Sequence, residues 1–439
     1  MHAHVPRVVR KTAIVFLIIG LLGTTAALAL PGPGGPDPTF DDNGLQTTDY
    51  LAKGWFDIAW DTLVQPDGKI LVVGEHYDPA HVNTQTRDIM LARYNDDGSL
   101  DDTFHNDGMR IVDLGGAERG LGIALQSSGK IVFSALTCEG GECNLAVVRT
   151  NAAGFYDSTF NGGLGYVLLN VPASFLSDKG GLAVQSDDKI VVGTTIDDAA
   201  EGGLPSMLVA RVTANGTLDN TFSSDGKVKF SFGSNKSDRA ADLALRGGKV
   251  VIVGESCGAT DCNFAVARLD SSGKLDKTFN GTGRRLTSFG GVDSAYGVAI
   301  QSNGRIVAVG ARKGLSSVMA VARYNTDGTL DADFSGDGKR TIPLGTSAEA
   351  RGVIIADGGT IVIGGIADNG TNDDYAAARL KARGGLDATF DDDGKTQIDF
   401  GTAERAHSLA VQPADGKYVL AGASDGLFLW DFSVLRLLP

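Results

Sequence analysis

Short apolar runs bounded by Gly, Asn and Asp follow one another along the chain after residue 38. Examples are Asp88–Tyr94, Met109–Leu114 and Gly120–Leu125. Alternation of apolar and polar positions with a period of two is typical of half-buried strands, and turn residues at both ends favour hairpins. No segment beyond the first thirty residues shows a helical period. The pattern therefore predicts an all-β protein.

These runs recur in a unit of about 57 residues. Each unit combines Gly-x-Leu-Asp-x-Thr-Phe-x-x-x-Gly, Gln-x-x-Gly-Lys-Ile-Val-Val-x-Gly and an apolar run closed by Arg, with some copies degenerate. The Phe recurs as Phe40, Phe104, Phe160, Phe222, Phe279, Phe334 and Phe390. The Arg recurs as Arg93, Arg149, Arg211, Arg268, Arg323, Arg379 and Arg436. The chain therefore consists of seven similar structural units.

Each unit predicts four short strands, which precede the Gln, follow it, end at the Arg and follow the Phe-x-x-x-Gly turn. Seven four-stranded antiparallel units predict a seven-bladed β-propeller over residues 39–439. The last unit lacks its fourth strand. We expect the N-terminal segment Asn43–Tyr50 to complete that blade, so that the ring closes where the two ends of the chain meet.

The two motifs together resemble the delta-60 repeat, a bacterial β-propeller repeat of unassigned function. The resemblance covers Asp37–Leu437 and implies an exported or surface protein. Departures are the insertion Asn161–Gly165 and the missing Gln at Leu245 and Ala356. The family implies no catalytic residues, so the resemblance does not decide the function.

Residues 1–29 have the composition of a secretory signal peptide. A basic N-terminal region precedes the apolar run Ala13–Leu22, and small residues end at Ala29. An uncleaved membrane anchor is the alternative. Residues 30–38 form a Pro/Gly-rich lead-in. We expect an exported protein of the periplasm or the extracellular medium, without stable membrane insertion after cleavage.

The chain is acidic and rich in glycine. It carries 53 acidic and 39 basic residues, a formal net charge of −14, and removal of three basic residues with the signal peptide makes it −17. This charge disfavours nucleic acid as a partner. The 60 glycines agree with a protein that contains many tight turns.

The four cysteines form two local pairs, Cys138 with Cys143 and Cys257 with Cys262. In an oxidising compartment this spacing predicts two disulfides at hairpin tips. A zinc site made of all four thiolates is the alternative, but the two-residue spacing typical of such sites is absent.

Residues that recur in every unit are expected to be structural. The Asp of Leu-Asp-x-Thr-Phe should accept hydrogen bonds within its own turn. The recurring Arg should cap carbonyls or pair with acids, and the Phe should fill the space between blades. The recurring acids are Asp101, Asp157, Asp219, Asp276, Asp331 and Asp387.

A second acid recurs about eight positions before the Gln position. If its strand is the innermost of each blade, these acids ring the mouth of the central channel and would bind a cation or a charged ligand. Salt bridges between blades are the alternative role. The channel-mouth acids are Asp57, Glu118, Asp178, Asp238, Asp293, Glu349 and Glu404.

Loops that vary between units should share one face of the propeller, where recognition is expected. Aromatic and histidine residues concentrate in the first and last units, and such rings suit a glycan, peptide or protein ligand. The alternative is that they seal the seam between the chain ends. The candidate ligand-binding residues are Trp55, Phe56, His76, Tyr77, His81, His407, Phe428 and Trp430.

Asp-rich turns at Asn95–Gly98, Ser335–Gly338 and Asp391–Gly394 offer oxygen ligands of the kind that calcium binds, although none has the spacing of an EF-hand. Solvated turns are the alternative. Apart from calcium at such turns, we expect no cofactor and no other metal.

The sequence favours an exported, monomeric binding or scaffold propeller whose variable loops hold a glycan, peptide or protein near the channel mouth. Histidine is scarce, and no His-Glu-x-x-His motif occurs. The alternative is a propeller-type hydrolase or lyase that combines His76, His81 or His407 with an acid at the channel mouth.

Overall fold

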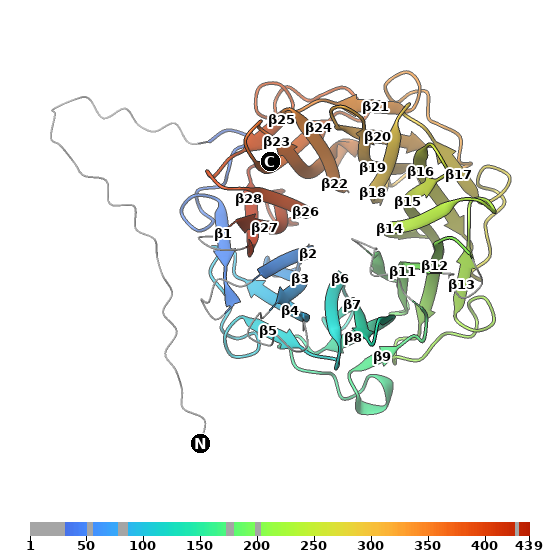
Figure 1. Ribbon diagram of the computed structural model, residues 1–439. Coiled ribbons are helices and arrows are strands. Elements are labelled where there is room, and N and C mark those ends of the chain that lie inside the picture. The colour runs from blue at the N-terminus through green and yellow to red at the C-terminus, as the bar shows by residue number, and fades with distance from the viewer. Residues whose placement is uncertain (1–30, 51–55, 78–86, 173–179, 198–202, 426–429) are drawn as a thin grey trace.

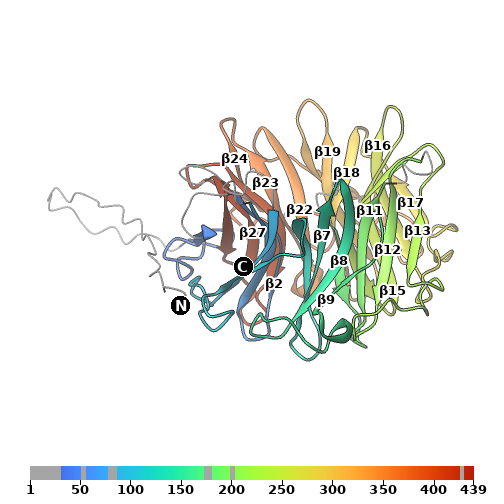
Figure 2. The ribbon, with the colours of Figure 1, turned by 60° about the horizontal axis from the view of Figure 1, so that its bottom comes forward.

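The computed structural model describes residues 31–50, 56–77, 87–172, 180–197, 203–425 and 430–439. Residues 1–29, which are expected to be a signal peptide, lie outside these ranges, as do Trp55, His81, Asp178 and Phe428. Antiparallel sheets stand around a central axis, with one strand of each nearest the centre (Figure 1). The sheets stand side by side, with loops at both ends (Figure 2). The prediction of an all-β protein is confirmed.

The described strands fall into groups of four, here called sheets I to VII, in which consecutive strands pair. Sheet I contains β2 (Phe56–Val64), β3 (Ile70–Tyr77), β4 (Arg87–Tyr94) and β5 (Met109–Val112). Sheet II contains β6 (Ala117–Leu125), β7 (Ile131–Glu139), β8 (Glu142–Thr150) and β9 (Tyr166–Leu168). Sheet III contains β10 (Leu182–Val184), β11 (Ile190–Ile196), β12 (Ser206–Val212) and β13 (Lys227–Phe230).

Sheets IV and V are joined by one parallel pair, Cys262 with Val292. Sheet IV contains β14 (Ser237–Arg246), β15 (Lys249–Cys257), β16 (Cys262–Leu269) and β17 (Arg284–Thr287). Sheet V contains β18 (Val292–Ile300), β19 (Ile306–Lys313), β20 (Val318–Tyr324) and β21 (Lys339–Ile342). Sheet VI contains β22 (Ser347–Ile355), β23 (Ile361–Asp368), β24 (Asp373–Leu380) and β25 (Lys395–Ile398). Two 3₁₀ turns are η2 (Asn161–Gly163) and η4 (Asp357–Gly359).

Sheet VII combines both ends of the described chain. It contains β26 (Glu404–Val411), β27 (Tyr418–Asp425), β28 (Trp430–Leu437) and β1 (Leu45–Thr48). The antiparallel register of β1 and β28 pairs Leu45 with Leu435 and Thr48 with Phe432. Figure 1 shows blue β1 beside red β28 at the outer edge of this sheet. The segment Asn43–Tyr50 thus supplies the strand that the last unit lacks.

The hydrophobic core lies between neighbouring sheets. One cluster joins Leu71 and Phe104 of the first unit to Ile123 and Phe133 of sheet II, all within 5% of complete burial. Apolar side chains on both faces of the middle strands explain why the Ile-Val-Val runs are continuous rather than alternating. Burial of such side chains favours folding by about 1.5–3 kcal/mol each.

A recurrent contact joins the Arg that ends each third strand to the Asp and Phe of the Leu-Asp-x-Thr-Phe turn. The Arg Nε lies 2.6–2.9 Å from the carboxylate, and its guanidinium carbon lies 4.5–5.0 Å from the centre of the Phe ring. The pairs are Arg93–Asp101, Arg149–Asp157, Arg211–Asp219, Arg268–Asp276, Arg323–Asp331, Arg379–Asp387 and Arg436–Asp37.

The same turn contacts the next sheet. The N–H of His105, directly after Phe104, donates to Ala153 O of the following unit at 2.9 Å, and Arg93 Nη1 donates to Ala152 O at 2.5 Å. Gly154 has a φ of 86°, and a Cβ there would lie 2.7 Å from the ring of Phe104. Glycine therefore allows the two units to approach closely. The structural roles expected for the recurring Asp, Arg and Phe are those observed.

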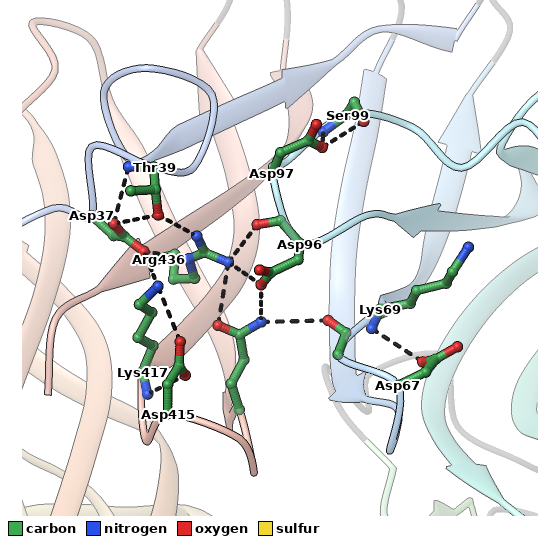
Figure 3. Close-up of polar contacts among 12 residues, drawn as sticks. Asp37, Thr39, Asp67, Lys69, Asp96, Asp97, Ser99, Asp415, Lys417 and Arg436 are labelled. Carbon is green, nitrogen blue, oxygen red and sulfur yellow. Dashed lines mark hydrogen bonds and ion pairs between the residues drawn. The ribbon is translucent and has the colours of Figure 1, made fainter.

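Figure 3 shows the copy of this contact that joins the chain ends. Arg436 donates to Asp37 and to Thr39 Oγ1, and its Nη1 reaches Asp96 of the first unit at 2.7 Å. Lys417 lies 3.0 Å from the carboxylate of Asp37. Asp37, in the segment expected to be an irregular lead-in, is therefore part of the recurrent contact.

Two disulfides join Cys138 to Cys143 and Cys257 to Cys262. Each pairs the last residues of a second strand with the first residues of a third strand, at a hairpin tip. The disulfide prediction is confirmed. With their sulfur atoms paired, the four cysteines do not form the alternative thiolate zinc site.

Candidate functional site

Five of the acids expected at the channel mouth are buried. Each of these five accepts a hydrogen bond from a backbone N–H of the loop that leads into its strand, so it fixes the connection between two sheets. The donors and acceptors are Tyr50 to Asp57 at 2.9 Å, Gly116 to Glu118 at 2.7 Å, Phe232 to Asp238 at 2.7 Å, Phe289 to Asp293 at 2.6 Å and Phe400 to Glu404 at 3.5 Å. All five acids are 0% exposed, so they do not form the open ring that their spacing predicted.

Glu349 does not belong to this series. The first strand of most units contains a β-bulge. In β2 the last regularly paired residue before the bulge is Ala59, and the buried acid, Asp57, lies two residues before Ala59. In β22 the corresponding residues are Ala350 and Ala348. Glu349 instead approaches Arg351 at 2.6 Å, within its own strand. The spacing to the Gln position was therefore misread by one residue.

A further set of carboxylates lies at the junctions between sheets VI and VII, VII and I, and I and II. Each junction contributes one Asp five residues before the recurrent Arg, one Asp five residues after the Gly of Phe-x-x-x-Gly, and the buried acid of the next sheet. The sets are Asp374, Asp399 and Glu404; Asp431, Asp49 and Asp57; and Asp88, Asp113 and Glu118. We call them the acidic junctions VI/VII, VII/I and I/II.

The other junctions carry neutral residues at the first two positions. They are Asn144 and Asn170, Ser206 and Ser231, Asn263 and Ser288, and Val318 and Pro343. At the junction of sheets IV and V, Ser288 Oγ donates to Asp293 at 3.3 Å, where an acidic junction has a second carboxylate instead. The three acidic junctions are consecutive, so negative charge is concentrated on one side of the loop face.

Burial and the repulsion between like charges raise the pKa values of several of these carboxyl groups. Burial raises the pKa of Glu118 to about 7, and the charges of Asp113 and Asp88 add to the effect. Burial likewise raises the pKa of Asp431 to about 7, with contributions from Asp49, Asp57 and Asp425. Burial and the charge of Asp374 raise the pKa of Glu404 as well. Removing carboxylates from water disfavours the charged form, so this region favours cations or protons.

Described members of the predicted aromatic set lie beside acidic junction VII/I. His76 Nδ1 lies 2.5 Å from Asp57 Oδ1, and its ring makes an edge contact with Tyr50 at 4.9 Å between centroids. Phe56 and Tyr77 make a similar contact at 6.2 Å. These residues come from β2, β3 and the segment after β1, so the seam brings them together.

Trp430 and His407 belong to different environments. The guanidinium of Arg405 stacks on Trp430 at 4.9 Å. His407 is the bulged residue of β26 and packs against the bulged Trp60 of β2, with ring centroids 4.5 Å apart. Trp60 lines a central cavity of about 80 Å³. His407 thus packs beside a residue that lines this cavity.

A larger cavity, of about 700 Å³, lies at the opposite loop face between sheets IV, V and VI. Its lining includes Arg246, Arg305, Arg323 and the turn Asp357–Gly359. Arg246 pairs with Lys249 across the hairpin. In other units the Gln occupies the position that corresponds to Arg246. The departures noted at Leu245 and Ala356 thus both fall beside this cavity.

In the Asp-rich turns considered as calcium sites, the Asp side chains accept hydrogen bonds from nearby residues of the same segment. Asp97 Oδ1 accepts hydrogen bonds from the N–H and hydroxyl of Ser99, and Asp337 and Asp393 accept bonds from the N–H two residues on. Calcium binding at these turns stays a prediction.

Two segments have the Gly-x-Ser-x-Gly spacing, Gly254–Gly258 and Gly422–Gly426. Their serines, Ser256 and Ser424, lie within β15 and β27 and are at least 95% buried. A nucleophile elbow instead requires an exposed Ser between a strand and a helix.

No sequence motif pointed to Asp49, Tyr50, Asp88, Asp113 or Asp431. Each junction combines residues that lie far apart in sequence, so no local motif marks them. Alignment of the units on the recurrent Arg and Gly would have shown which units carry Asp at these positions.

Five segments match the family model described as "Domain of unknown function (DUF5122) beta-propeller". They are residues 65–104, 185–222, 248–279, 301–334 and 359–390. These repeats belong to that β-propeller family, which confirms the resemblance seen in the sequence. No curated protein matches the chain in sequence.

Solved structures of similar fold include Drosophila Semaphorin 2a, at 9% identity and a TM-score of 0.52, covering 93% of this chain and 76% of that chain. The polysaccharide lyase Uly1 is 12% identical, covering 89% and 91% with a TM-score of 0.49. A PL25 ulvan lyase bound to -[GlcA(1-4)Rha3S]- is 12% identical, covering 93% and 95% with a TM-score of 0.47. Likeness at this identity shows the fold alone. Within the described ranges, no helix is long and apolar enough to cross a membrane.

Proposed function

We propose that the chain is a seven-bladed β-propeller closed by β1, and that it acts as an exported binding module. The pairing of β1 with β28 and the contact of Arg436 with Asp37 support closure. Asp41 N–H also donates to Asp97 O at 2.9 Å, the same bond that His105 makes to the unit after its own. The ends thus repeat the contacts that join units elsewhere.

Export to the periplasm or the medium is part of this proposal. The signal-like composition of residues 1–29 supports it, as do the disulfides Cys138–Cys143 and Cys257–Cys262, because such bonds persist mainly in oxidising compartments. A monomer remains our expectation for the oligomeric state.

The ligand contacts the loop face at the acidic junctions. The observation that carries this assignment is the concentration of carboxylates at three consecutive junctions, beside the partly exposed rings of Tyr50, Phe56, Tyr77 and Trp430. Like charges so close together favour a cationic partner, and aromatic rings add apolar contact area. Among the glycan, peptide and protein ligands predicted from the sequence, this surface favours a basic peptide or a basic protein segment.

The test is binding of a library of fluorescent peptides that differ in Lys and Arg content, measured by polarisation at two salt concentrations. We expect basic peptides to bind, and to bind more weakly at high salt because exposed charges are screened. The variant Asp431→Asn with Trp430→Ala should lose at least about tenfold in affinity, or roughly 1.4 kcal/mol. Asp357→Asn, on the opposite loop face, is the matched control.

Equal binding of neutral and basic peptides, or equal losses in both variants, would contradict this assignment. Selective binding of neutral oligosaccharides would also contradict it, since a glycan would then be the ligand. Unchanged melting temperatures of the variants show that any loss concerns binding and not folding.

The alternative function is that of a propeller-type hydrolase or lyase, and the Asp57–His76 pair favours it. A carboxylate 2.5 Å from an imidazole can orient a general base. His76 is only 3% exposed, however, which keeps its ring from a substrate in this conformation. Turnover of a polysaccharide panel that disappears in His76→Gln would establish the enzyme and overturn the pure binding role.

A further inference from the structure

Acidic junction I/II has the composition of a metal site. Asp88 comes from β4, Asp113 follows β5 and Glu118 lies in β6, so two sheets contribute to it. One carboxylate oxygen of each residue lies within 4.8 Å of the others. Two oxygens that both bind one calcium ion at about 2.4 Å lie at most about 4.8 Å apart. The spacing therefore fits a shared calcium ion.

Glu118 supplies a second observation that points to a ligand. Its side chain is fully buried, and Oε1 accepts hydrogen bonds from the N–H of Gly116 at 2.7 Å and from Thr137 Oγ1 at 2.8 Å. Oε2 is buried without a hydrogen-bond partner among the described residues. A buried carboxylate oxygen that has neither donor nor cation is costly, so a ligand at this position would remove the cost.

At the equivalent junction VI/VII, both oxygens of the buried acid have donors. Glu404 Oε2 accepts a hydrogen bond from the Phe400 N–H at 3.5 Å, and Oε1 accepts one from Thr402 Oγ1 at 2.5 Å. Junction I/II has no corresponding donor to Oε2 of Glu118 within the described part of the chain. The two junctions therefore differ in the donors to the buried acid.

We propose that Asp88, Asp113 and Glu118 bind a calcium ion that joins sheets I and II. Carboxylates alone suit a hard cation, and the exposed Asp113 gives the ion access from solvent and room for water ligands. The bonds from Thr137 and Gly116 orient Glu118 for this role. Junction I/II is one of the three acidic junctions assigned to the peptide ligand, but calcium binding there does not require a bound peptide, and the site is separate from the Asp-rich turns.

Calorimetric titration of the EDTA-treated full chain with CaCl₂ tests the proposal. We expect one ion with a dissociation constant of about 10⁻⁴–10⁻³ M, the range of extracellular calcium modules, and weaker binding of MgCl₂. Asp113→Asn should weaken binding at least about tenfold, because one charged ligand is lost. Asp399→Asn at junction VI/VII is the matched control and should bind calcium as the original chain does.

Thermal unfolding gives a second readout. Calcium at 10 mM should raise the melting temperature of the original chain and of Asp399→Asn clearly more than that of Asp113→Asn, since binding to the folded state alone stabilises it. Asp113 is exposed, so its substitution should not disturb folding without calcium. Absence of binding at millimolar calcium, tighter binding of magnesium, or loss in Asp399→Asn rather than Asp113→Asn overturns the proposal.

Discussion

The guanidinium of Arg436 lies 2.7 Å from the carboxylate of Asp37, although 399 residues separate them in the sequence. Both side chains are 1% exposed. In the other units the corresponding Arg and Asp are eight residues apart, as in Arg93 and Asp101. One contact therefore serves both as a local turn constraint and as the link between the ends of the chain.

Removal of one partner of this buried pair should be strongly destabilising. We expect Asp37→Asn to lower the free energy of unfolding by up to about 3–5 kcal/mol, because the buried guanidinium of Arg436 then keeps only the exposed Asp96 as an acidic partner. The measurement is denaturant unfolding followed by intrinsic fluorescence. The exposed Asp102→Asn in an equivalent turn is the control and should change stability by less than about 0.5 kcal/mol.

Deletion of Thr39–Tyr50 tests the same closure at the level of a whole strand. The deletion removes β1 and the buried ring of Phe40, and it exposes the edge of β28. We expect a sharply lower melting temperature and a tendency to aggregate, since an unpaired edge templates pairing with other chains. An unchanged melting temperature would show that β1 is dispensable.

The recurrent contacts predict loss of stability in acid. Burial raises the pKa of Asp101, but hydrogen bonds from Lys69 and Thr103 and the charge of Arg93 outweigh burial and hold that pKa well below its usual range. Asp219 behaves similarly. A lowered pKa contributes stability above the unfolded-state pKa of about 4, and this stability is lost as pH falls further. Melting temperatures should therefore drop steeply below about pH 4, and a flat profile down to pH 2 would contradict the expectation.

The raised pKa of Asp431 predicts that stability falls, rather than rises, as the pH increases above about 4. Burial raises its pKa to about 7, with help from Asp49, Asp57 and Asp425. Because the folded-state pKa exceeds the unfolded-state value, the group lowers stability as pH rises from about 4 to 7. After allowance for solvent screening, the loss is on the order of 1 kcal/mol. Asp431→Asn should remove this part of the pH profile, whereas Asp357→Asn should leave it intact.

The disulfides should contribute modestly. Each closes a small loop, so the chain-entropy model assigns about 2 kcal/mol to each bond. We expect the double variant Cys138→Ser with Cys143→Ser to fold and to lose about this much stability, as measured by denaturant unfolding with Cys257–Cys262 intact. Failure of this variant to fold would show that the hairpin tip matters far more than loop closure implies.

The repeated motifs predicted the architecture well because they encode contacts within a unit and between neighbouring units. The recurring Arg, Asp and Phe could be assigned structural roles, since seven copies left little room for one asymmetric ligand. The four cysteines were paired correctly from their local spacing. These features depend on sequence separations that the chain itself fixes.

The site was harder to predict because it depends on bulges and on junctions. Successive side chains lie on opposite faces of a strand, so Glu349, one residue from the position of the buried acids, lies on the other face of β22, and Ala348 occupies that position. The acidic junctions combine the ends of three strands from two sheets, and their first two positions differ between units. Burial, which turns expected surface acids such as Glu118 into enclosed ones, is absent from a spacing pattern.

The pairing of β1 with β28 also sets an order of events during synthesis. The chain is made from its N-terminus, so β1 emerges long before its partner and must wait without a neighbour until β28 appears. Sheets I to VI need only local segments and can form earlier. Sheet VII is therefore the group of strands whose completion requires nearly the whole of the described chain.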